Sequence, residues 1–181
     1  MKATGIVRRI DELGRVVIPK EIRRTLRLKE GDPLEIFTSH DELMLKKYSP
    51  IATLDRFSKA TARSLNDLSG LLAVICDTDG ILHAVGEGRK DLDGKGLSEE
   101  MDRILKERRS YIANASEGGD ILPLTDANEE GITAQVIVPI VAGGDCFGAV
   151  AVLSKEDGAK MNEHEMNLAR LTADILANQF E

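Results

Sequence analysis

Basic side chains gather near the start of the chain. Five arginines and one lysine stand between short apolar stretches: Arg8, Arg9, Arg15, Lys20, Arg23 and Arg24. A guanidinium group offers a planar fork of N–H donors that fits phosphate oxygens or the N7/O6 edge of guanine, and it cannot lose its charge. The pattern therefore predicts an anionic partner for this segment.

Charge is distributed unevenly along the 181 residues. The whole chain has a formal net charge of −7, yet residues 1–29 carry nine lysines and arginines against three acids, a net charge of +6. Residues 30–181 therefore carry a net charge of −13. An acidic protein can still bind DNA, because the local field at the docking face decides. The alternative is that the arginines are solvated or paired with Asp11, Glu12 and Glu21, but three carboxylates cannot neutralise nine cations.

The elements expected around the arginines form a small unit. The sequence predicts strands at 5–10, 15–18, 34–38 and 43–48, and a helix from Pro19 to about Leu28. The apolar residues of the last two strands can share one face: Leu34, Ile36, Leu43 and Leu45. About 50 residues with so few apolar side chains are marginal alone, and open strand edges invite pairing. We therefore expect an obligate dimer that could exchange strands.

Tyr48-Ser49-Pro50 marks a boundary in the sequence. Helical spacing from Leu54 to Leu68 predicts a helix that Ser69-Gly70 ends. This helix could be a short interchain coil, or it could pack on the following domain. The expected organisation is an N-terminal domain at 1–50, a linker helix at 51–70 and a second domain at 71–181.

The second domain is predicted to be an antiparallel sheet flanked by helices, which makes the chain α+β. Strands are expected at Leu71–Asp77, Ile81–Val85, Thr133–Val141 and Cys146–Leu153, the last two joined by a glycine turn. Ser98 suits the cap of a helix whose apolar side would hold Met101, Ile104, Leu105 and Ile112. Asn162 and Glu165 fit a capping box for a helix at about 163–180. That helix has two apolar stripes, and the second predicts contact with another helix or subunit.

The N-terminal motifs resemble the DNA-binding module of AbrB-like transition-state regulators. The matching residues are Thr4-Gly5-Ile6-Val7-Arg8, Asp11, Leu13-Gly14-Arg15-Val16-Val17-Ile18-Pro19 and Glu21-Ile22-Arg23-Arg24. The resemblance covers residues 1–50 and implies a swapped-hairpin β-barrel dimer that binds double-stranded DNA. It implies DNA contacts by Arg8, Arg15, Arg23 and Arg24, while Arg9 and Lys20 stand where members of the family vary. The same fold class includes antitoxins, so an antitoxin-like or scaffold module that binds a protein is the alternative.

The C-terminal part resembles a GAF domain, a fold used for sensing small molecules or for dimerisation. The residues that carry this resemblance are Val136-Ile137-Val138-Pro139-Ile140 and Cys146-Phe147-Gly148-Ala149-Val150. The two modules in this order resemble a family of sporulation regulators. That implies a cytoplasmic, nucleoid-associated activator or repressor acting in the developing spore, tetrameric through its C-terminal domains. We expect no cofactor beyond an unidentified small-molecule ligand, and a purely oligomerising domain is the alternative.

An enzyme is not expected from these residues. The three histidines, His40, His83 and His164, stand in separate segments, and neither Cys76 nor Cys146 has a CxxC neighbour, so we expect no metal site. Both cysteines are expected to be reduced and buried, with a disulfide as the lesser alternative. Gly86-Glu87-Gly88 lacks the third glycine of a dinucleotide fingerprint, and no Ser-His-Asp motif is apparent. A polar start and the absence of an apolar run of about 20 residues predict no signal peptide and no membrane partner.

Overall fold

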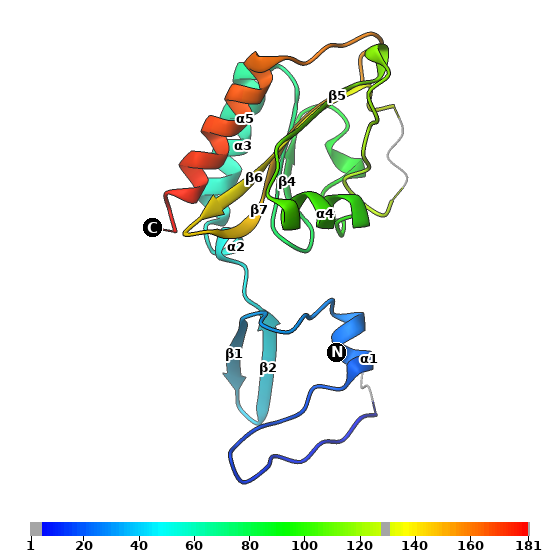
Figure 1. Cartoon of the computed structure of the whole chain (residues 1–181). Coiled ribbons are helices and arrows are strands. Elements are labelled where there is room, and N and C mark those ends of the chain that lie inside the picture. Colours follow the sequence, from blue (N-terminus) through cyan, green and yellow to red (C-terminus); the bar gives the residue numbers. More distant parts are fainter. Residues whose placement is uncertain (1–4, 128–130, 181) are drawn as a thin grey trace. The chain divides into compact units, whose positions relative to one another are not determined.

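The chain folds as two units, divided between Tyr48 and Ser49, in the computed structural model, which describes residues 5–127 and 131–180. Thr4, the first residue of the N-terminal motif, lies outside the described residues. Helices and antiparallel sheets occur in both parts of the chain, so the predicted α+β class is confirmed (Figure 1). We call the two parts the N-terminal unit and the C-terminal unit.

The N-terminal unit contains one short helix and one hairpin. Helix α1 (Lys20–Thr25) begins after Pro19, whose fixed φ favours a helix start. Strand β1 (Leu34–Ser39) pairs with β2 (Glu42–Lys47), and Ile36 stands opposite Leu45. The predicted hairpin and the shared face of its apolar residues are therefore confirmed.

Two strands predicted in this unit are absent from the single chain. The described residues 5–18 form no strand, although their turn is hydrogen bonded: Gly14 N–H donates to Asp11 O, and Asp11 N–H donates to Arg15 O, each over 3.0 Å. A strand exists only where a second strand satisfies its N–H and C=O groups. Among the described residues, no strand pairs with this segment.

Helix α1 is also shorter than predicted, because Arg27 adopts a left-handed conformation with φ 51°. Leu28 N–H then donates to Arg23 O over 2.7 Å, and Arg27 N–H donates to Arg24 O over 3.2 Å. This pair of bonds is a Schellman motif, which ends a helix. The sequence did not indicate it, because glycine normally occupies the position of Arg27.

The C-terminal unit is built on a five-stranded antiparallel sheet of order β4-β3-β7-β6-β5. Its strands are β3 (Leu72–Cys76), β4 (Ile81–Val85), β5 (Tyr111–Asn114), β6 (Ala134–Ala142) and β7 (Asp145–Ser154). The predicted turn between β6 and β7 is confirmed, with Gly143 and Gly144 both at positive φ. Gly148 lies so close to β3 that an added Cβ would stand 2.0 Å from the carbonyl oxygen of Cys76.

Helices cover both faces of this sheet (Figure 1). The helices α3 (Asp55–Ser69) and α5 (Glu163–Ala177), with the short α2 (Pro50–Thr53), pack on one face, and α4 (Glu99–Glu107) packs on the other. Two short 3-10 turns, η1 (Arg89–Asp91) and η2 (Ala115–Glu117), lie in the connections. Each face has its own buried core. Ala62, Leu65 and Leu176 are among the helix residues of the first, and Met101, Ile104 and Leu105 belong to the second.

The predicted helix ends of this unit are largely confirmed. Ser98 Oγ accepts the Met101 N–H over 3.1 Å, Asn162 and Glu165 form the capping box of α5, and Gly70 ends α3 at φ 70°. The assignment of Ile112 to α4 is wrong. Arg108, at φ 54°, ends that helix, and Ile112 pairs with Val136 as part of β5.

The two thiols are free but differ in burial. Cys76 is buried, and desolvation raises the pKa of its thiol to about 12. Cys146 is only partly buried, so the expectation of two buried thiols is wrong for this residue. Desolvation raises the pKa of the Cys146 thiol as well. Among the described residues, no helix is both long and apolar enough to cross a membrane.

Candidate nucleic-acid interface

The six basic residues singled out in the sequence are all exposed, and we call them the basic set: Arg8, Arg9, Arg15, Lys20, Arg23 and Arg24. Arg8, Arg9 and Arg15 lie on the irregular segment that precedes α1. Lys20, Arg23 and Arg24 lie on α1 at spacings of three and four residues, which puts them on one side of the helix. The helix thus brings three members of the set together.

Arg15 is held by Asp11 across the turn. Arg15 Nε donates to Asp11 Oδ2 over 2.7 Å, while the backbone N–H groups of Arg15 and Leu13 donate to Oδ1 over 2.8 and 3.0 Å. These bonds, that of the Arg15 backbone N–H first, hold the pKa of Asp11 below its usual value of 3.8. The ion pair uses only the Nε donor, and the Arg15 side chain is 71% exposed, so further donors remain for a ligand.

The other members of the basic set are less constrained. Arg8 Nη1 donates to the Val7 carbonyl oxygen over 3.1 Å. Within residues 5–127 and 131–180, no ion pair involves Arg8, Arg9, Lys20, Arg23 or Arg24. Within the basic set, local pairing with described acids, the alternative drawn from the sequence, therefore accounts for Arg15 but not for the other five residues. The set offers charge and hydrogen-bond donors but no nucleophile.

Apolar side chains beside the basic set are exposed as well. On the irregular segment, Val7 is 83% exposed and Val17 is 72% exposed. On the hairpin, Ile36 and Leu43 are 61% and 65% exposed. A monomeric unit rarely leaves so much of its apolar surface in water. The charged groups and an uncovered apolar surface thus belong to the same unit.

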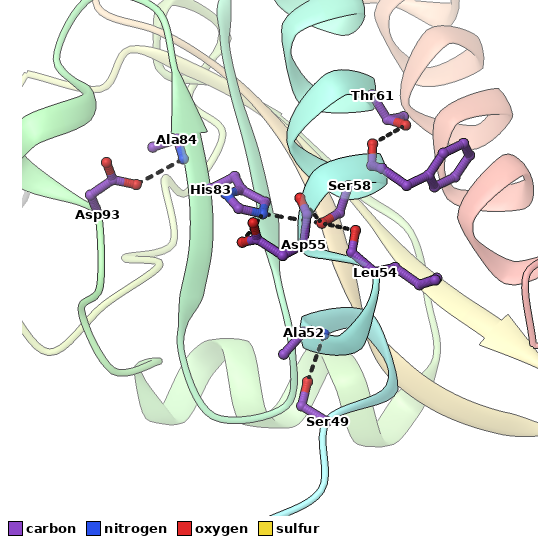
Figure 2. Close-up of polar contacts among 10 residues, drawn as sticks. Ser49, Ala52, Leu54, Asp55, Ser58, Thr61, His83, Ala84 and Asp93 are labelled. Atoms are coloured by element: carbon purple, nitrogen blue, oxygen red, sulfur yellow. Dashed lines mark hydrogen bonds and ion pairs between the residues drawn. The ribbon is translucent and has the colours of Figure 1, made fainter.

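A second polar cluster lies in the C-terminal unit. His83 Nε2 stands 3.1 Å from Ser58 Oγ and 3.5 Å from Asp55 Oδ1 (Figure 2). Both contacts use the same ring nitrogen, whereas a catalytic triad uses one nitrogen for serine and the other for the acid. Desolvation lowers the pKa of His83, and the opposing charge of Asp55 is the smaller effect. In the described part of the chain, no three His, Cys, Asp or Glu residues are grouped as metal ligands.

Sequence reasoning missed Ser58, which is fully buried. Its spacing from Ala62 and Leu65 places it on the buried side of α3, and that spacing was a usable signal. The Ser58 hydroxyl donates to the Leu54 carbonyl oxygen over 3.0 Å, the kind of local bond that satisfies a buried serine within a helix.

Comparison with known proteins gives matches over both units. A family described as stage V sporulation protein T C-terminal, transcription factor, matches residues 53–181. A family described as antidote-toxin recognition MazE, bacterial antitoxin, matches residues 7–53. The chain is 46% identical to stage V sporulation protein T of Bacillus subtilis (strain 168), over 100% of this chain and 99% of that protein. It is 47% identical to the transition state regulatory protein AbrB of the same organism, over 41% of this chain and 77% of that protein.

A solved structure supports the fold of the C-terminal unit. The GAF domain region of a putative membrane protein from Geobacter sulfurreducens PCA superposes with a TM-score of 0.56 at 21% identity, over 72% of this chain and 94% of that one. The strand order and the helices on both faces are thus those of a GAF fold, as expected. At this identity the likeness concerns the fold alone.

Proposed function

The chain belongs to the family of stage V sporulation protein T and is a transcription regulator of sporulation; on that premise we propose that its N-terminal unit binds double-stranded DNA as a homodimer. Arg8, Arg15, Arg23 and Arg24 make the principal contacts, and Arg9 and Lys20 add charge beside them. These residues combine phosphate contacts, which position the protein, with base contacts, which select the sequence.

The observation that carries this proposal is the exposed basic set with almost no internal partners. Five of its six members have no ion pair with the described residues. Gathering like charges on one small unit is unfavourable unless an anion accompanies them. DNA supplies a row of phosphates, and each neutralised phosphate releases counterions and strengthens binding.

Dimerisation follows from what the N-terminal unit leaves uncovered. No strand of the described part of the chain pairs with residues 5–18, and the side chains of Val7, Ile10 and Val17 are exposed. A second copy can supply both strand partners and an apolar surface, as an exchanged-hairpin barrel would. The basic sets of the two copies then form one DNA-binding surface.

A second contact, through the C-terminal unit, would make the protein a tetramer. The second stripe predicted on α5 is exposed at Leu171 (59%) and Ile175 (39%), and Phe57 and Leu68 are exposed on the neighbouring α3. An amphipathic helix with an uncovered second stripe is suited to packing on another helix. Four N-terminal units on one assembly would strengthen DNA binding by linkage.

An antitoxin-like or scaffold module remains the second candidate, because the antitoxin family matches residues 7–53. Such a module would bind a protein partner. A folded C-terminal unit argues against a disordered segment that wraps a toxin. Stable co-purification of one protein partner, without any shift of promoter DNA, would favour this candidate over the DNA-binding regulator.

The proposal is tested by mapping the DNA that the protein occupies in sporulating cells, where we expect it on the nucleoid of the developing spore. Wild type should occupy discrete promoter-proximal sites, whether it activates or represses there. Arg8→Ala should lose most of that occupancy, whereas Arg103→Ala, which removes one exposed charge from α4, should retain it. Equal occupancy by all three proteins would contradict the assignment of Arg8.

A further inference from the structure

A cavity opens at the edge of the sheet of the C-terminal unit, whereas the basic set belongs to the N-terminal unit. It has a volume of about 600 Å³ and lies between the first turns of α3, the edge strand β4 and the η1 turn. Sites for small molecules typically enclose about 300–1,000 Å³. The face of the sheet under α4 is filled by core side chains such as Leu92 and Met101, so this cavity is separate from that face.

Four cationic side chains line the cavity. Lys59 and Arg63 stand one turn apart on α3, and Arg89 and Lys90 are consecutive in η1. None of the four forms an ion pair with any residue that the structure describes. They gather in a part of the sequence, residues 49–181, that has 13 lysines and arginines against 23 acids. A cationic cavity in an acidic unit indicates an anionic ligand.

The two carboxylates of the cavity have structural contacts of their own. Asp93 Oδ1 accepts the Ala84 N–H over 3.0 Å, which ties the η1 region to β4 (Figure 2). Asp55 Oδ1 lies 3.5 Å from His83 Nε2. Two acids do not neutralise four cations, so a positive excess remains at the opening.

The floor of the cavity is less polar than its rim. Leu82 and Val85 of β4 are half-buried, and His83 is only 9% exposed and contacts the buried Ser58. A ligand that fits this arrangement carries a compact anionic group and an uncharged part. Phosphate suits the cations, because charge-assisted bonds from Lys and Arg to phosphate are strong. The uncharged part would cover Leu82 and Val85.

We propose that this cavity binds a phosphorylated small molecule, with the phosphate held by Lys59, Arg63, Arg89 and Lys90. The cavity volume of about 600 Å³ is that of a small-molecule site, whereas duplex DNA presents a long row of phosphates. The site is independent of DNA binding by the basic set, and either assignment can fail without the other.

Pyrophosphate is the probe for a direct test on the full-length protein. Nuclear magnetic resonance of labelled His83 and Leu82 reports on the cavity alone, which matters because the basic set also attracts pyrophosphate. Wild type should show saturable shifts of both signals. Lys59→Gln with Arg63→Gln should weaken that affinity about tenfold or more, because two charge-assisted contacts are lost. A thermal melt would establish that this variant is folded.

The matched control is Arg103→Gln with Lys106→Gln, which removes two exposed cations from α4 in the same unit. Its affinity at the cavity should equal that of wild type. If pyrophosphate affinity fell equally in both double variants, the loss of net charge alone would explain the effect. That result would overturn the proposal. Unchanged His83 and Leu82 signals would also overturn it, as would shifts caused by duplex DNA but not by pyrophosphate.

Discussion

The charged side chains of this protein form two groups. Some are bonded to other residues of the chain, and others remain available to a ligand. Asp11 holds Arg15 at 2.7 Å, while Arg23 and Arg24 have no ion pair among the described residues. The C-terminal unit shows the same division between Asp93, which accepts a backbone N–H, and Arg63, which forms no ion pair with a residue in 5–127 or 131–180. A ligand of opposite charge gains most at the available groups, because no internal bond is lost.

His83 should titrate below its ordinary pKa of 6.5, because burial disfavours the imidazolium despite Asp55 nearby. As the pH falls, His83 therefore binds a proton at a higher pH in the unfolded chain than in the folded chain. The contribution of neutral His83 to the free energy of unfolding is therefore complete above pH 6.5. It is lost as the pH falls through the lower pKa that His83 has in the folded chain. The charge of Lys59 lowers the pKa of His83 further, and the charge of Asp93 raises it.

The check is a histidine-resolved titration by nuclear magnetic resonance, together with thermal melts at several pH values. Stability of the C-terminal unit should decline on acidification more steeply in wild type than in His83→Gln. A His83 midpoint at or above 6.5 would contradict the burial described here.

At the scale of helices and strands, the features that depend on neighbouring residues were predictable from the sequence. The features that depend on a partner strand far away in the sequence were not. The turn at Gly143 and Gly144 and the cap at Ser98 depend on neighbouring residues, and both were predicted correctly. Strands at 5–18 depend on a partner strand, and the residues that the structure describes supply none. Ile112 fitted a helical spacing, yet pairing with β6 determines its place. Of the candidate site, residue types and exposure were predictable, whereas the bond between Asp11 and Arg15 required the turn geometry.

Val17→Asp should break the N-terminal dimer, because Val17 is an exposed apolar residue on the segment that lacks a partner strand. We expect DNA affinity to fall by about tenfold or more, since an interface charge without a partner is costly and half of the basic surface is lost. Binding titrations and mass by light scattering would measure both effects. Ser39→Asp, at the polar end of β1, should leave both unchanged. A dimer of normal affinity with Val17→Asp would rule out this interface.

Gly148→Ala should destabilise the C-terminal unit by about 3 kcal/mol, because the new Cβ would overlap the Cys76 carbonyl oxygen. Gly158→Ala is the control. It introduces a Cβ with nothing within 4 Å, at φ 75°, and should cost only about 1 kcal/mol of backbone strain. Chemical denaturation of both variants gives the comparison. Similar losses of free energy would mean that the approach of β7 to β3 is looser than described.

For the molecule as a whole, the charges and the uncovered apolar surfaces suit the assembly that we propose. The N-terminal unit exposes cations and apolar side chains together, while the C-terminal unit exposes the second stripe of α5 beside α3. Two separate uncovered surfaces on one chain allow two kinds of contact, and two contacts of twofold type with perpendicular axes would give a closed tetramer. The complete DNA-binding surface would then exist only in the oligomer.

Leu171→Glu with Ile175→Glu should halve the mass of the assembly, because two charges would enter the α5 contact. Adding Val17→Asp to this variant should give a monomer. Light scattering measures each mass, and Asn167→Glu, a charge on an already polar position of α5, should keep the wild-type mass. A monomer produced by the α5 substitutions alone would show that the N-terminal units do not pair.

The most direct test of the central claim is the salt dependence of DNA affinity, measured on one genomic fragment that the wild-type protein occupies. Arg23→Ala and Arg24→Ala should each lower affinity. A phosphate contact should flatten the slope of log affinity against log salt by about one unit, and a base contact should cost about 1–3 kcal/mol and relax sequence preference. Arg103→Ala should match wild type throughout. If Arg23→Ala and Arg24→Ala also match wild type in affinity, slope and preference, the basic set is not the DNA-binding surface.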